Sequence, residues 1–203
     1  MSAPVLHVAT GNTHKLDELR HALEAAFGPV ELRGLRDFPE LPEPVEDGAT
    51  LEENALIKAR ALHRHAGGLC VADDTGLMVD ALDGAPGVFS ARWAGEGCSY
   101  ADNVRKMCRE IAFVPPAGRQ ARFETVLAVL EPEGRETLLR GVCHGVILVE
   151  PRGAEGFGYD PVFLLPGLDK TFAELGLEEK NKVSHRGRAV AALVDWLRTK
   201  RGW

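Results

Sequence analysis

The stretch 69–77, LCVADDTGL, leads an apolar run directly into two neighbouring aspartates. The run predicts a buried strand over 69–73, and the Thr-Gly pair at 75–76 predicts a turn before a second strand. Because successive side chains of a strand point to opposite faces, Asp73 and Asp74 are expected to have different functions. One carboxylate can accept hydrogen bonds from the turn, and the other can face a ligand at the carboxyl end of the strand. Two solvated turn aspartates explain this segment equally well.

The rest of the chain alternates between helical and strand patterns. Apolar spacing, caps and turn residues predict helices over 14–27, 50–65 and 99–113 and from 184 onward, and strands over 4–10, 30–35, 69–73 and on both sides of the Pro-Glu-Gly turn at 132–134. Strand-helix alternation favours parallel pairing, whereas the Pro-Glu-Gly turn favours an antiparallel hairpin. The 203 residues therefore predict one α/β domain over 1–203, with a mixed, twisted central sheet and flanking helices.

The composition limits the class of protein. The chain has 30 acidic residues against 24 Lys and Arg, a net charge of −6, so it has no global attraction for nucleic acid or acidic membranes. The first residues lack the basic and apolar regions of a secretion signal, and no apolar window is long enough for a membrane span. We therefore expect a cytoplasmic protein without a nucleic-acid or membrane partner. The 4 cysteines are too dispersed for a zinc site or a disulfide framework, and we expect them to be reduced.

Residues 9–15, ATGNTHK, lie at a predicted junction between a strand and a helix. Free backbone N–H groups and the helix dipole make such a junction an anion site, and Lys15 can add charge to it. A plain Asn or Thr N-cap explains the same residues without a ligand.

Lys58 falls in the apolar stripe of the helix predicted over 50–65, together with Leu51, Ala55 and Leu62. The lysine can bury its stem and extend its ammonium to water, which is the more ordinary explanation. Alternatively, the ammonium faces an anion at the edge of the core.

Two further groups of charged residues indicate ligands. One of the paired aspartates, together with Glu46 and Asp47, can form a Mg²⁺ site, because Mg²⁺ prefers carboxylate oxygens and keeps several waters. Cationic side chains gather near the start of the last predicted helix, where the helix dipole disfavours them and a bound anion would offset the cost. Solvation and salt screening offset it equally well. These side chains are Lys180, Lys182, His185, Arg186 and Arg188.

Five segments, in order along the chain, resemble the inosine/xanthosine triphosphate pyrophosphatase family: TGNTHK, EDGATLEENALIKA, ADDTGLMVDALDGAPGVFSARWAG, GFGYDPVF and EKNKVSHRGRA. The resemblance implies an α/β fold with two lobes around a substrate cleft. It also implies a homodimer that uses Mg²⁺ to hydrolyse ITP, dITP and XTP to the monophosphate and pyrophosphate. Such an enzyme removes non-standard purine nucleotides from the nucleotide pool.

The resemblance also implies roles for individual residues. Asp74 is similar to the family's proton acceptor and metal ligand, and Glu46 or Asp47 supplies another metal ligand. His185 or Arg186 can donate a hydrogen bond to the 6-oxo group of the base and so reject adenine. The remaining positions that are similar to the family's substrate contacts are Thr10, Gly11, Asn12, Thr13, His14, Lys15, Lys58, Thr75, Phe157, Gly158, Tyr159, Asp160 and Lys180.

Three other functions stay open at this point. A structural interaction protein would leave Lys58 in the apolar stripe and the cationic helix start uncompensated. A related Maf-type pyrophosphatase would hydrolyse other modified nucleotides, so a comparison of ITP, XTP, dUTP and methylated UTP separates it from the first hypothesis. A regulatory nucleotide-binding module would bind the nucleotide without releasing pyrophosphate.

Overall fold

A computed structural model describes residues 4–203, which form two compact units. Unit 1 consists of the described residues up to Asp74 together with Thr125–Gly141 and Arg186–Trp203. Unit 2 consists of Thr75–Glu124 and Val142–His185. Each unit has its own apolar core.

The strands follow the order β2-β1-β3-β5-β6-β7-β8, and β4 pairs with β3. β1 and β2 belong to unit 1, β4, β7 and β8 belong to unit 2, and β3, β5 and β6 contribute residues to both. The bounds are β1 Val5–Val8, β2 Glu31–Arg33, β3 Cys70–Val79, β4 Pro86–Gly87, β5 Gln120–Leu130, β6 Glu136–Ile147, β7 Phe163–Leu165 and β8 Lys170–Thr171.

The helices are α1 Thr13–Phe27, α2 Leu51–Ala66, α3 Tyr100–Glu110, α4 Leu177–Val183 and α5 His185–Trp196. Short 3-10 helices lie at Leu35–Asp37, Asp80–Leu82, Ser90–Arg92, Pro116–Gly118, Asp160–Val162 and Phe172–Glu174, and a π-helical turn at Leu197–Arg201 follows α5.

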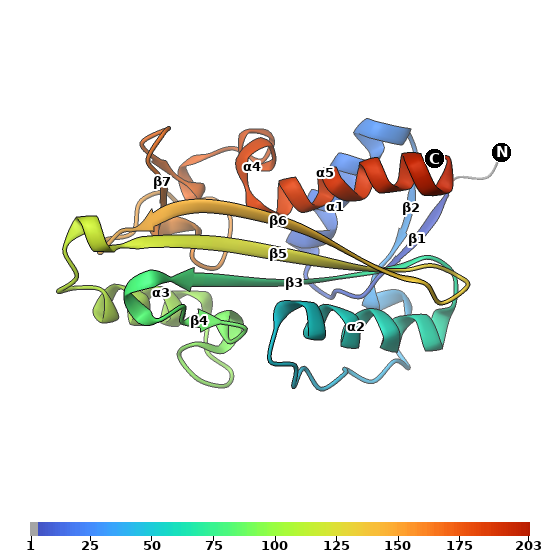
Figure 1. The fold of residues 1–203 in the computed structure, drawn as a ribbon, viewed down its shortest axis with the longest axis horizontal. Helices are drawn as coiled ribbons and strands as arrows, with labels where there is room; N and C mark the ends of the chain where they lie inside the picture. The colour runs from blue at the N-terminus through green and yellow to red at the C-terminus, as the bar shows by residue number, and fades with distance from the viewer. Residues whose placement is uncertain (1–3) are drawn as a thin grey trace. The chain divides into compact units, whose positions relative to one another are not determined.

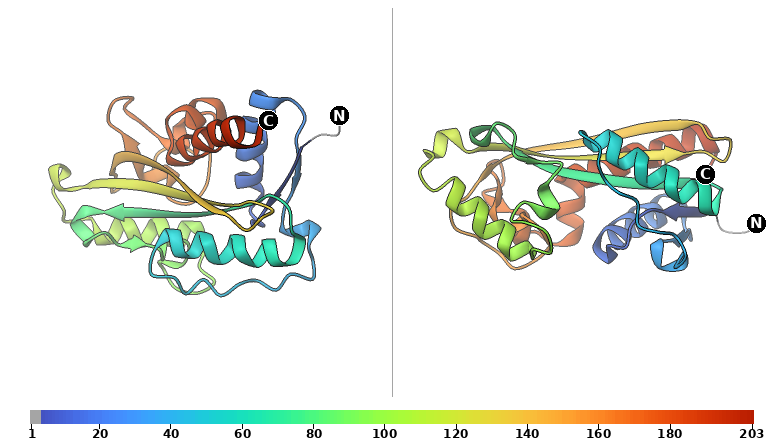
Figure 2. Two further views of the ribbon diagram at one scale, coloured as in Figure 1. Left: turned by 45° about the vertical axis from the view of Figure 1, so that its right-hand side comes forward. Right: turned by 90° about the horizontal axis from the view of Figure 1, so that it is seen from below.

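In unit 1, β1 pairs in parallel with β2 and with β3. Helices α1 and α5 cover one side of these strands and α2 covers the other, as Figures 1 and 2 both show. The core between these strands and helices α1 and α5 contains Leu6, Leu23, Val71 and Leu193. Parallel strands with helices on both faces are the expected product of strand-helix alternation.

In unit 2, β3 pairs with β4, β6 with β7, and β7 with β8, and all three pairs are antiparallel. The core includes a group of packed rings, in which Phe163 lies 4.7 Å from Phe123 and 5.0 Å from Phe172 between centroids. Met107 and Ile111, at the end of α3 and just after it, complete the packing. The mixture of parallel and antiparallel pairs confirms the predicted α/β class with a mixed sheet. The prediction of one domain over 1–203 stays a prediction.

The caps of the first two long helices agree with the sequence. Asn12 accepts hydrogen bonds from the backbone N–H groups of His14 and Lys15 at the start of α1. Thr50 and Glu53 form the predicted capping box at the start of α2. Lys58 lies among buried neighbours on α2, with only 12% of its side chain exposed, so its position in the apolar stripe is confirmed.

The predicted turn at Thr75-Gly76 is wrong, because β3 runs without interruption from Cys70 to Val79. Leu77 pairs with Gly87 of β4, so the residues after the aspartates are held in the sheet. Thr75 is β-branched and fits an extended backbone, and a single glycine does not end a strand that has a partner. Neither aspartate therefore anchors a turn at this position.

Two predicted helix boundaries also need correction. The helix expected to reach residue 113 ends at Glu110. Lys180 and Lys182 do not precede the last helix as loop residues but lie within α4, in its last turn, where the dipole favours cations. With 7 residues, α4 is too short for apolar periodicity to reveal it.

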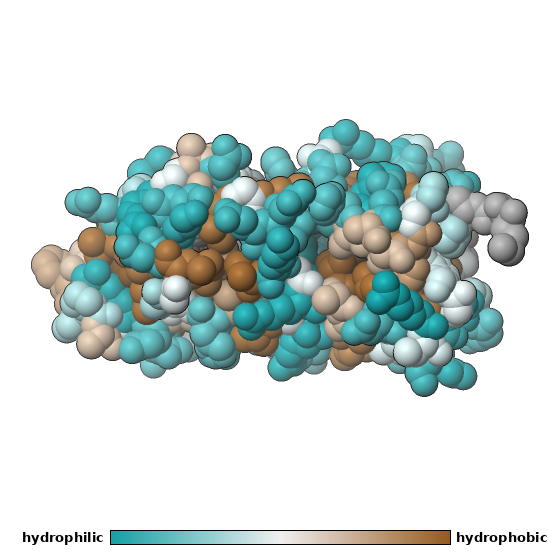
Figure 3. All heavy atoms as spheres, turned by 90° about the horizontal axis from the view of Figure 1, so that it is seen from above, coloured by the Kyte–Doolittle hydropathy of each residue, from teal (hydrophilic) through white to brown (hydrophobic). Residues whose placement is uncertain are grey.

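Charged and polar residues cover most of the face in Figure 3, with apolar residues in separate patches. Within residues 4–203, no helix combines the length and the apolar character that a membrane crossing requires.

Gly145 of β6 gives a test of the unit 2 packing. A Cβ added there would lie 2.5 Å from the Leu164 carbonyl oxygen and 2.6 Å from the Phe163 ring. We expect Gly145→Ala to lower the free energy of unfolding by about 1–3 kcal/mol through overpacking, as measured by urea denaturation. Gly167→Ala is the matched control, because its Cβ would meet no atom within 4 Å. Equal effects of the two substitutions would contradict this packing.

Candidate functional site

Asp73 and Asp74 are consecutive residues of β3, with exposed fractions of only 8% and 9%. Buried carboxylates need compensating partners, since the transfer of a charge out of water is costly. Each aspartate has a different set of partners, as the alternation of side chains along a strand predicts. We call the two sets the Asp73 cluster and the Asp74 cluster.

The Asp73 cluster contains Asp73, Lys15, Arg186 and Glu18. Lys15 Nζ lies 2.8 Å from Asp73 Oδ2, and Arg186 Nη2 lies 3.6 Å from the same oxygen. The Arg186 guanidinium also donates a hydrogen bond from Nη1 to Glu18 Oε2 at 2.9 Å. Lys15 and Glu18 are three residues apart on α1 and share a face of the helix. Two cations therefore alternate with two carboxylates in a largely buried, charge-balanced network.

This network changes the acidities of its members. Burial alone would raise the pKa of the Asp73 carboxyl, but the Lys15, Arg186 and Lys58 cations outweigh it and hold the pKa well below its ordinary value. Burial lowers the pKa of Lys15, and the charges of Arg186 and Lys58 act in the same direction against the attraction of Asp73. Asp73 therefore stays ionised and is poorly suited to accept a proton.

The Asp74 cluster contains Asp74, Lys58 and Glu46. Lys58 Nζ donates to Asp74 Oδ1 at 2.7 Å and to Glu46 Oε2 at 3.1 Å. Lys58 comes from α2, and Glu46 comes from the segment 42–48, which forms neither helix nor strand. One ammonium thus joins two carboxylates, which leaves an excess of one negative charge.

Asp74 has a pKa above its ordinary value. Burial raises it, the Lys58 ammonium partly offsets this effect, and the Glu46 carboxylate adds to it. Burial opposes the charge of Lys58, but the carboxylates of Asp74, Asp73 and Glu46 outweigh burial and raise the lysine's pKa. A carboxylate with a raised pKa is a stronger proton acceptor than an exposed one.

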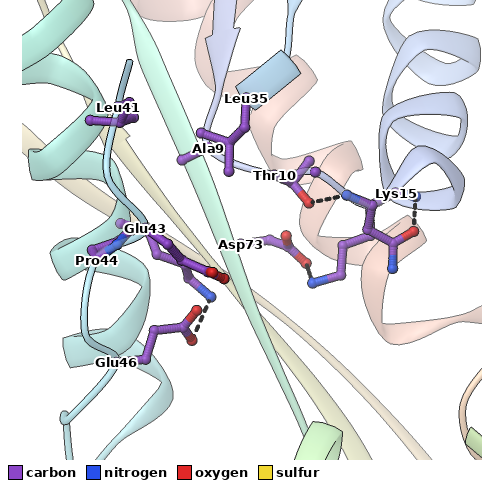
Figure 4. A pocket seen from close by; sticks show the side chains of 12 residues that line it. Ala9, Thr10, Lys15, Leu35, Leu41, Glu43, Pro44, Glu46 and Asp73 are labelled. Carbon is purple, nitrogen blue, oxygen red and sulfur yellow. Dashed lines mark hydrogen bonds and ion pairs between the residues drawn. The ribbon is translucent and has the colours of Figure 1, made fainter. Parts of the chain in front are cut away.

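A pocket of about 320 Å³ lies beside these clusters in unit 1. Figure 4 shows Lys15 and Asp73 on one side of it and Glu43 and Glu46 on the other. The start of α1 forms part of the wall, where Thr10 accepts a hydrogen bond from the backbone N–H of Asn12. The lining residues are Ala9, Thr10, Gly11, Asn12, Lys15, Leu35, Leu41, Glu43, Pro44, Glu46, Lys58 and Asp73.

The segment ATGNTHK is thus divided between two roles. Thr10, Gly11, Asn12 and Lys15 line the pocket, whereas Thr13 and His14 are exposed. The side chain of Asn12 caps the first N–H groups of α1, as the ligand-free explanation of the segment requires. Lys15 is the member that brings a charge into the pocket.

The Asp74 cluster fits a divalent metal ion in its chemistry. Asp74 and Glu46 supply carboxylate oxygens, which Mg²⁺ prefers, and both already bind the ammonium of Lys58. Within residues 4–203 no group of three or more acidic, His or Cys side chains is arranged to hold an ion. Two carboxylates are sufficient for Mg²⁺, which completes its coordination with waters and phosphate oxygens. Asp47 is exposed, so the arrangement favours Glu46.

In unit 2, Asp160 organises the GFGYD segment. Its Oδ2 accepts hydrogen bonds from the Phe157 backbone N–H and from Lys180 Nζ, both at 2.8 Å. Lys180 Nζ also lies 4.9 Å from the centroid of the Phe157 ring. Gly156, with a φ of +76°, passes so close to the Asp160 carboxylate that a Cβ would collide with it. Asp160 and Lys180 are both buried and together fix the position of Phe157.

The other predicted contacts of unit 2 differ in exposure. Tyr159 is buried and donates a hydrogen bond from its hydroxyl to the Ser90 carbonyl at 2.9 Å. His185 is buried and stacks on Phe123, with ring centroids 4.4 Å apart and an interplanar angle of 16°. Gly158, with a φ of +64°, has open space where a Cβ would lie. Thr75 is half-buried on β3.

Three residues of these arrangements were not expected from the sequence. Glu18 binds Arg186, Phe123 stacks on His185, and Asn54 of α2 accepts a hydrogen bond from Gly48 in the acidic loop. A signal existed for Glu18, because an acid three residues after Lys15 falls next to Leu19 and Leu23 on the buried face of α1. Partners distant in sequence, such as Phe123 and His185, leave no such pattern.

These features define an α/β protein with a charged pocket beside a pair of buried aspartates. A model of the Ham1 family matches residues 6–196 of the chain. A dITP/XTP pyrophosphatase of Geobacter sulfurreducens is 49% identical over 198 residues, which cover 98% of this chain and 96% of that protein. A dITP/XTP pyrophosphatase of Thermoanaerobacter pseudethanolicus is 48% identical over 190 residues, 94% of each chain.

Solved structures agree with the sequence matches. The nucleoside-triphosphatase / dITP/XTP pyrophosphatase of Mycobacterium abscessus is 48% identical, with a TM-score of 0.76 over 93% of this chain and 98% of that one. A HAM1 protein from Coxiella burnetii is 37% identical, with a TM-score of 0.87 over 96% and 98% of the two chains. The chain belongs to the Ham1 family.

The Asp73 cluster gives a test by stability. We expect Asp73→Asn to lower the free energy of unfolding at pH 7 by about 3–5 kcal/mol, because Lys15 and Arg186 lose a buried carboxylate. The pKa of Asp73 is depressed in the folded state, so its contribution is complete above its unfolded pKa of about 3.9 and is lost as the pH falls through the folded value. The difference between the two proteins, measured by urea denaturation, should therefore shrink on acidification.

Asp195→Asn is the control for this experiment, because the Asp195 side chain is 78% exposed beside Arg198. This substitution should change the free energy of unfolding by no more than about 0.5 kcal/mol. A small difference for Asp73→Asn at pH 7 would show that the network does not stabilise unit 1. A large difference that stays constant on acidification would show that the ionised carboxylate is not the source of the stabilisation.

Proposed function

We propose that the protein hydrolyses ITP, dITP and XTP to the nucleoside monophosphate and pyrophosphate in the cytoplasm, with Mg²⁺. The names of the relatives that are 48–49% identical over nearly the whole chain support this activity. The observation that carries it in the molecule is the Asp74 cluster, in which the carboxylate of raised pKa binds Lys58, and Lys58 and Glu46 line the pocket.

The charge balance of the two clusters supports the use of a divalent cation. Lys15, Lys58 and Arg186 bring three positive charges, and Asp73, Asp74, Glu46 and Glu18 bring four negative ones. A triphosphate would therefore meet a site with no net positive charge. Asp74 and Glu46 are the residues that would hold Mg²⁺, which when bound neutralises phosphate charge and lowers the pKa of a coordinated water.

Asp74 is the proposed proton acceptor. Its carboxylate takes a proton from the water whose oxygen forms the new bond to phosphorus, while the bond between the α and β phosphates breaks and the electron pair leaves with pyrophosphate. The raised pKa of Asp74 makes this transfer more favourable. Lys15 and Lys58 bind the phosphate oxygens and stabilise the charge on the leaving group. In phosphoryl transfer such positioning and electrostatics supply most of the catalysis.

Recognition of the base is assigned to the GFGYD segment and to the first residues of α5. Phe157 is expected to stack on the base. His185 or Arg186 is expected to donate to the 6-oxo group, where adenine has an amino donor. Buried donors that lose their acceptor discriminate strongly between substrates, so we expect ATP to be a poor substrate. Tyr159 and Asp160 have hydrogen bonds within the protein and support these residues.

The substrate assignment is tested by pyrophosphate release from ITP, XTP, GTP, ATP, dUTP and methylated UTP, with and without Mg²⁺. Activity on ITP and XTP that requires Mg²⁺ is expected. Preference for methylated UTP would favour the Maf-type function, and binding without release would favour a regulatory module.

Asp74→Asn tests the mechanism in the same assay. The loss of a general base reduces turnover by about 10²–10⁴-fold, so we expect a loss in this range on ITP with unchanged far-UV circular dichroism. Asp195→Asn, an exposed acid outside the site, should keep full activity. An Asp74→Asn protein with full turnover would exclude Asp74 as the proton acceptor.

We also propose that the protein is a homodimer. The resemblance implies it, and large apolar side chains that are exposed in the single chain support it, among them Phe113 at 99% and Val45 at 77% exposure. Sedimentation equilibrium at micromolar concentration should give the mass of two chains. The mass of one chain would contradict the proposal.

A further inference from the structure

Glu46 is needed in the Asp74 cluster but lies in a segment that no helix or strand fixes. Residues 42–48 form neither, and Glu46 contributes to the cluster only through the position of its carboxylate, 3.1 Å from Lys58 Nζ. A carboxylate on an irregular segment is useful for ion binding only if the backbone next to it is held in place. The question is which side chain holds it.

Asn54 contacts the backbone of this segment two residues after Glu46. Its Oδ1 accepts a hydrogen bond from the Gly48 N–H at 2.9 Å. Asn54 is only 1% exposed, so the hydrogen bond is shielded from water and the Asn54 side chain is packed on all sides. Hydrogen bonds of buried amides are costly to lose, because the partner remains buried without a replacement.

The contact requires a glycine at position 48. A Cβ there would lie 2.7 Å from Asn54 Oδ1, 2.7 Å from the Cβ of Glu53 and 3.0 Å from the backbone nitrogen of Asn54. The first turn of α2 and the acidic segment are therefore packed against each other at a distance that only a residue without a side chain allows.

Asn54 and Lys58 are four residues apart on α2 and lie on the same face of the helix. One holds the backbone of the acidic segment and the other holds its carboxylate. Lys58 also holds Asp74, so α2 determines how far Glu46 lies from Asp74. This geometry belongs entirely to unit 1.

We propose that Asn54 is a positioning residue for the Mg²⁺ site, which acts by fixing the Gly48 backbone and through it the Glu46 carboxylate. The proposal rests on the proposed function, since it assigns Asp74 and Glu46 to the ion. Asn54 itself contacts neither the ion nor the substrate.

The experiment compares Asn54→Ala with the wild-type protein in two titrations with MgCl₂. The first measures turnover of ITP, and the second measures the thermal unfolding midpoint without nucleotide. Residues that orient metal ligands from outside the coordination sphere contribute about 10–100-fold to affinity. We expect the Mg²⁺ concentration for half-maximal turnover to rise by at least about 10-fold, with kcat at saturating Mg²⁺ largely kept. The rise of the thermal unfolding midpoint with MgCl₂ should likewise require a Mg²⁺ concentration at least about 10-fold higher in Asn54→Ala than in the wild-type protein.

Asn103→Ala is the matched control. Asn103 is also 1% exposed and also accepts, through Oδ1, a hydrogen bond from a loop backbone, the Ala94 N–H at 2.7 Å. It belongs to unit 2 and holds a loop without assigned metal ligands. The loss of a buried amide should lower stability in both variants, but the Mg²⁺ dependence should change only in Asn54→Ala. A simple structural role for Asn54 predicts the same behaviour for both.

Gly48→Ala tests the same contact from the loop side if Asn54→Ala does not fold. Its Cβ pushes the segment away from Asn54, and it should raise the required Mg²⁺ concentration as well. Unchanged Mg²⁺ dependence in a folded variant would overturn the positioning role and leave the proposed activity intact. A wild-type protein inactive on ITP, whose Mg²⁺-dependent stabilisation is nevertheless weakened in the variants, would overturn the activity and keep the positioning role.

Discussion

The burial of two consecutive aspartates in β3 imposes the strongest constraint on unit 1. Ionised carboxylates lose their hydration when a strand carries them into the interior, and only nearby cations and donors can replace it. Lys15 of α1 and Arg186 of α5 compensate Asp73, whereas Lys58 of α2 compensates Asp74. Helices from opposite sides of the strands therefore bring their charges to neighbouring residues, so the ion pairs and the apolar core require the same arrangement.

The two clusters differ in charge, and this difference separates their roles. Around Asp73 two cations face two carboxylates, which is a balanced network that keeps Asp73 ionised. Around Asp74 a single ammonium faces two carboxylates, and burial raises the pKa of the aspartate. The first arrangement joins α1 and α5 to β3, and the second joins α2 and the segment 42–48 to β3. Adjacent residues of identical chemistry thus differ in acidity through their surroundings alone.

Local patterns in the sequence were sufficient to predict much of the fold. The helices α1 and α2, their caps and the mixed sheet follow from apolar spacing and capping residues that lie close together in the chain. Lys58 was recognisable because a charge in an apolar stripe is unusual. The uninterrupted β3 was not predictable, because its continuation depends on pairing with β4, and a Thr-Gly pair alone indicates a turn. The short α4 also lacked a periodic signal.

The candidate site was predictable as a set of residues but not as a set of contacts. The pocket brings together Thr10, Lys15, Lys58 and Glu46, which come from three of the segments that the sequence singled out. The pairing of Arg186 with Glu18 spans 168 positions, and no local pattern reports such a contact. The choice between Glu46 and Asp47 depended on which of two neighbouring acids points inward, which an irregular segment does not encode by periodicity.

The direct succession of Asp73 and Asp74 in one strand makes unit 1 intolerant of any change in strand length. A shift of β3 by one residue moves every side chain to the other face of the sheet. Asp74 would then meet Lys15 and Arg186, and Thr75, which is uncharged, would face Lys58. A deletion within the first half of β3 would thus leave Lys58 without its buried carboxylate while leaving the composition of the strand almost the same. The ion pairs of the two aspartates thus constrain the number of residues between Cys70 and Asp74.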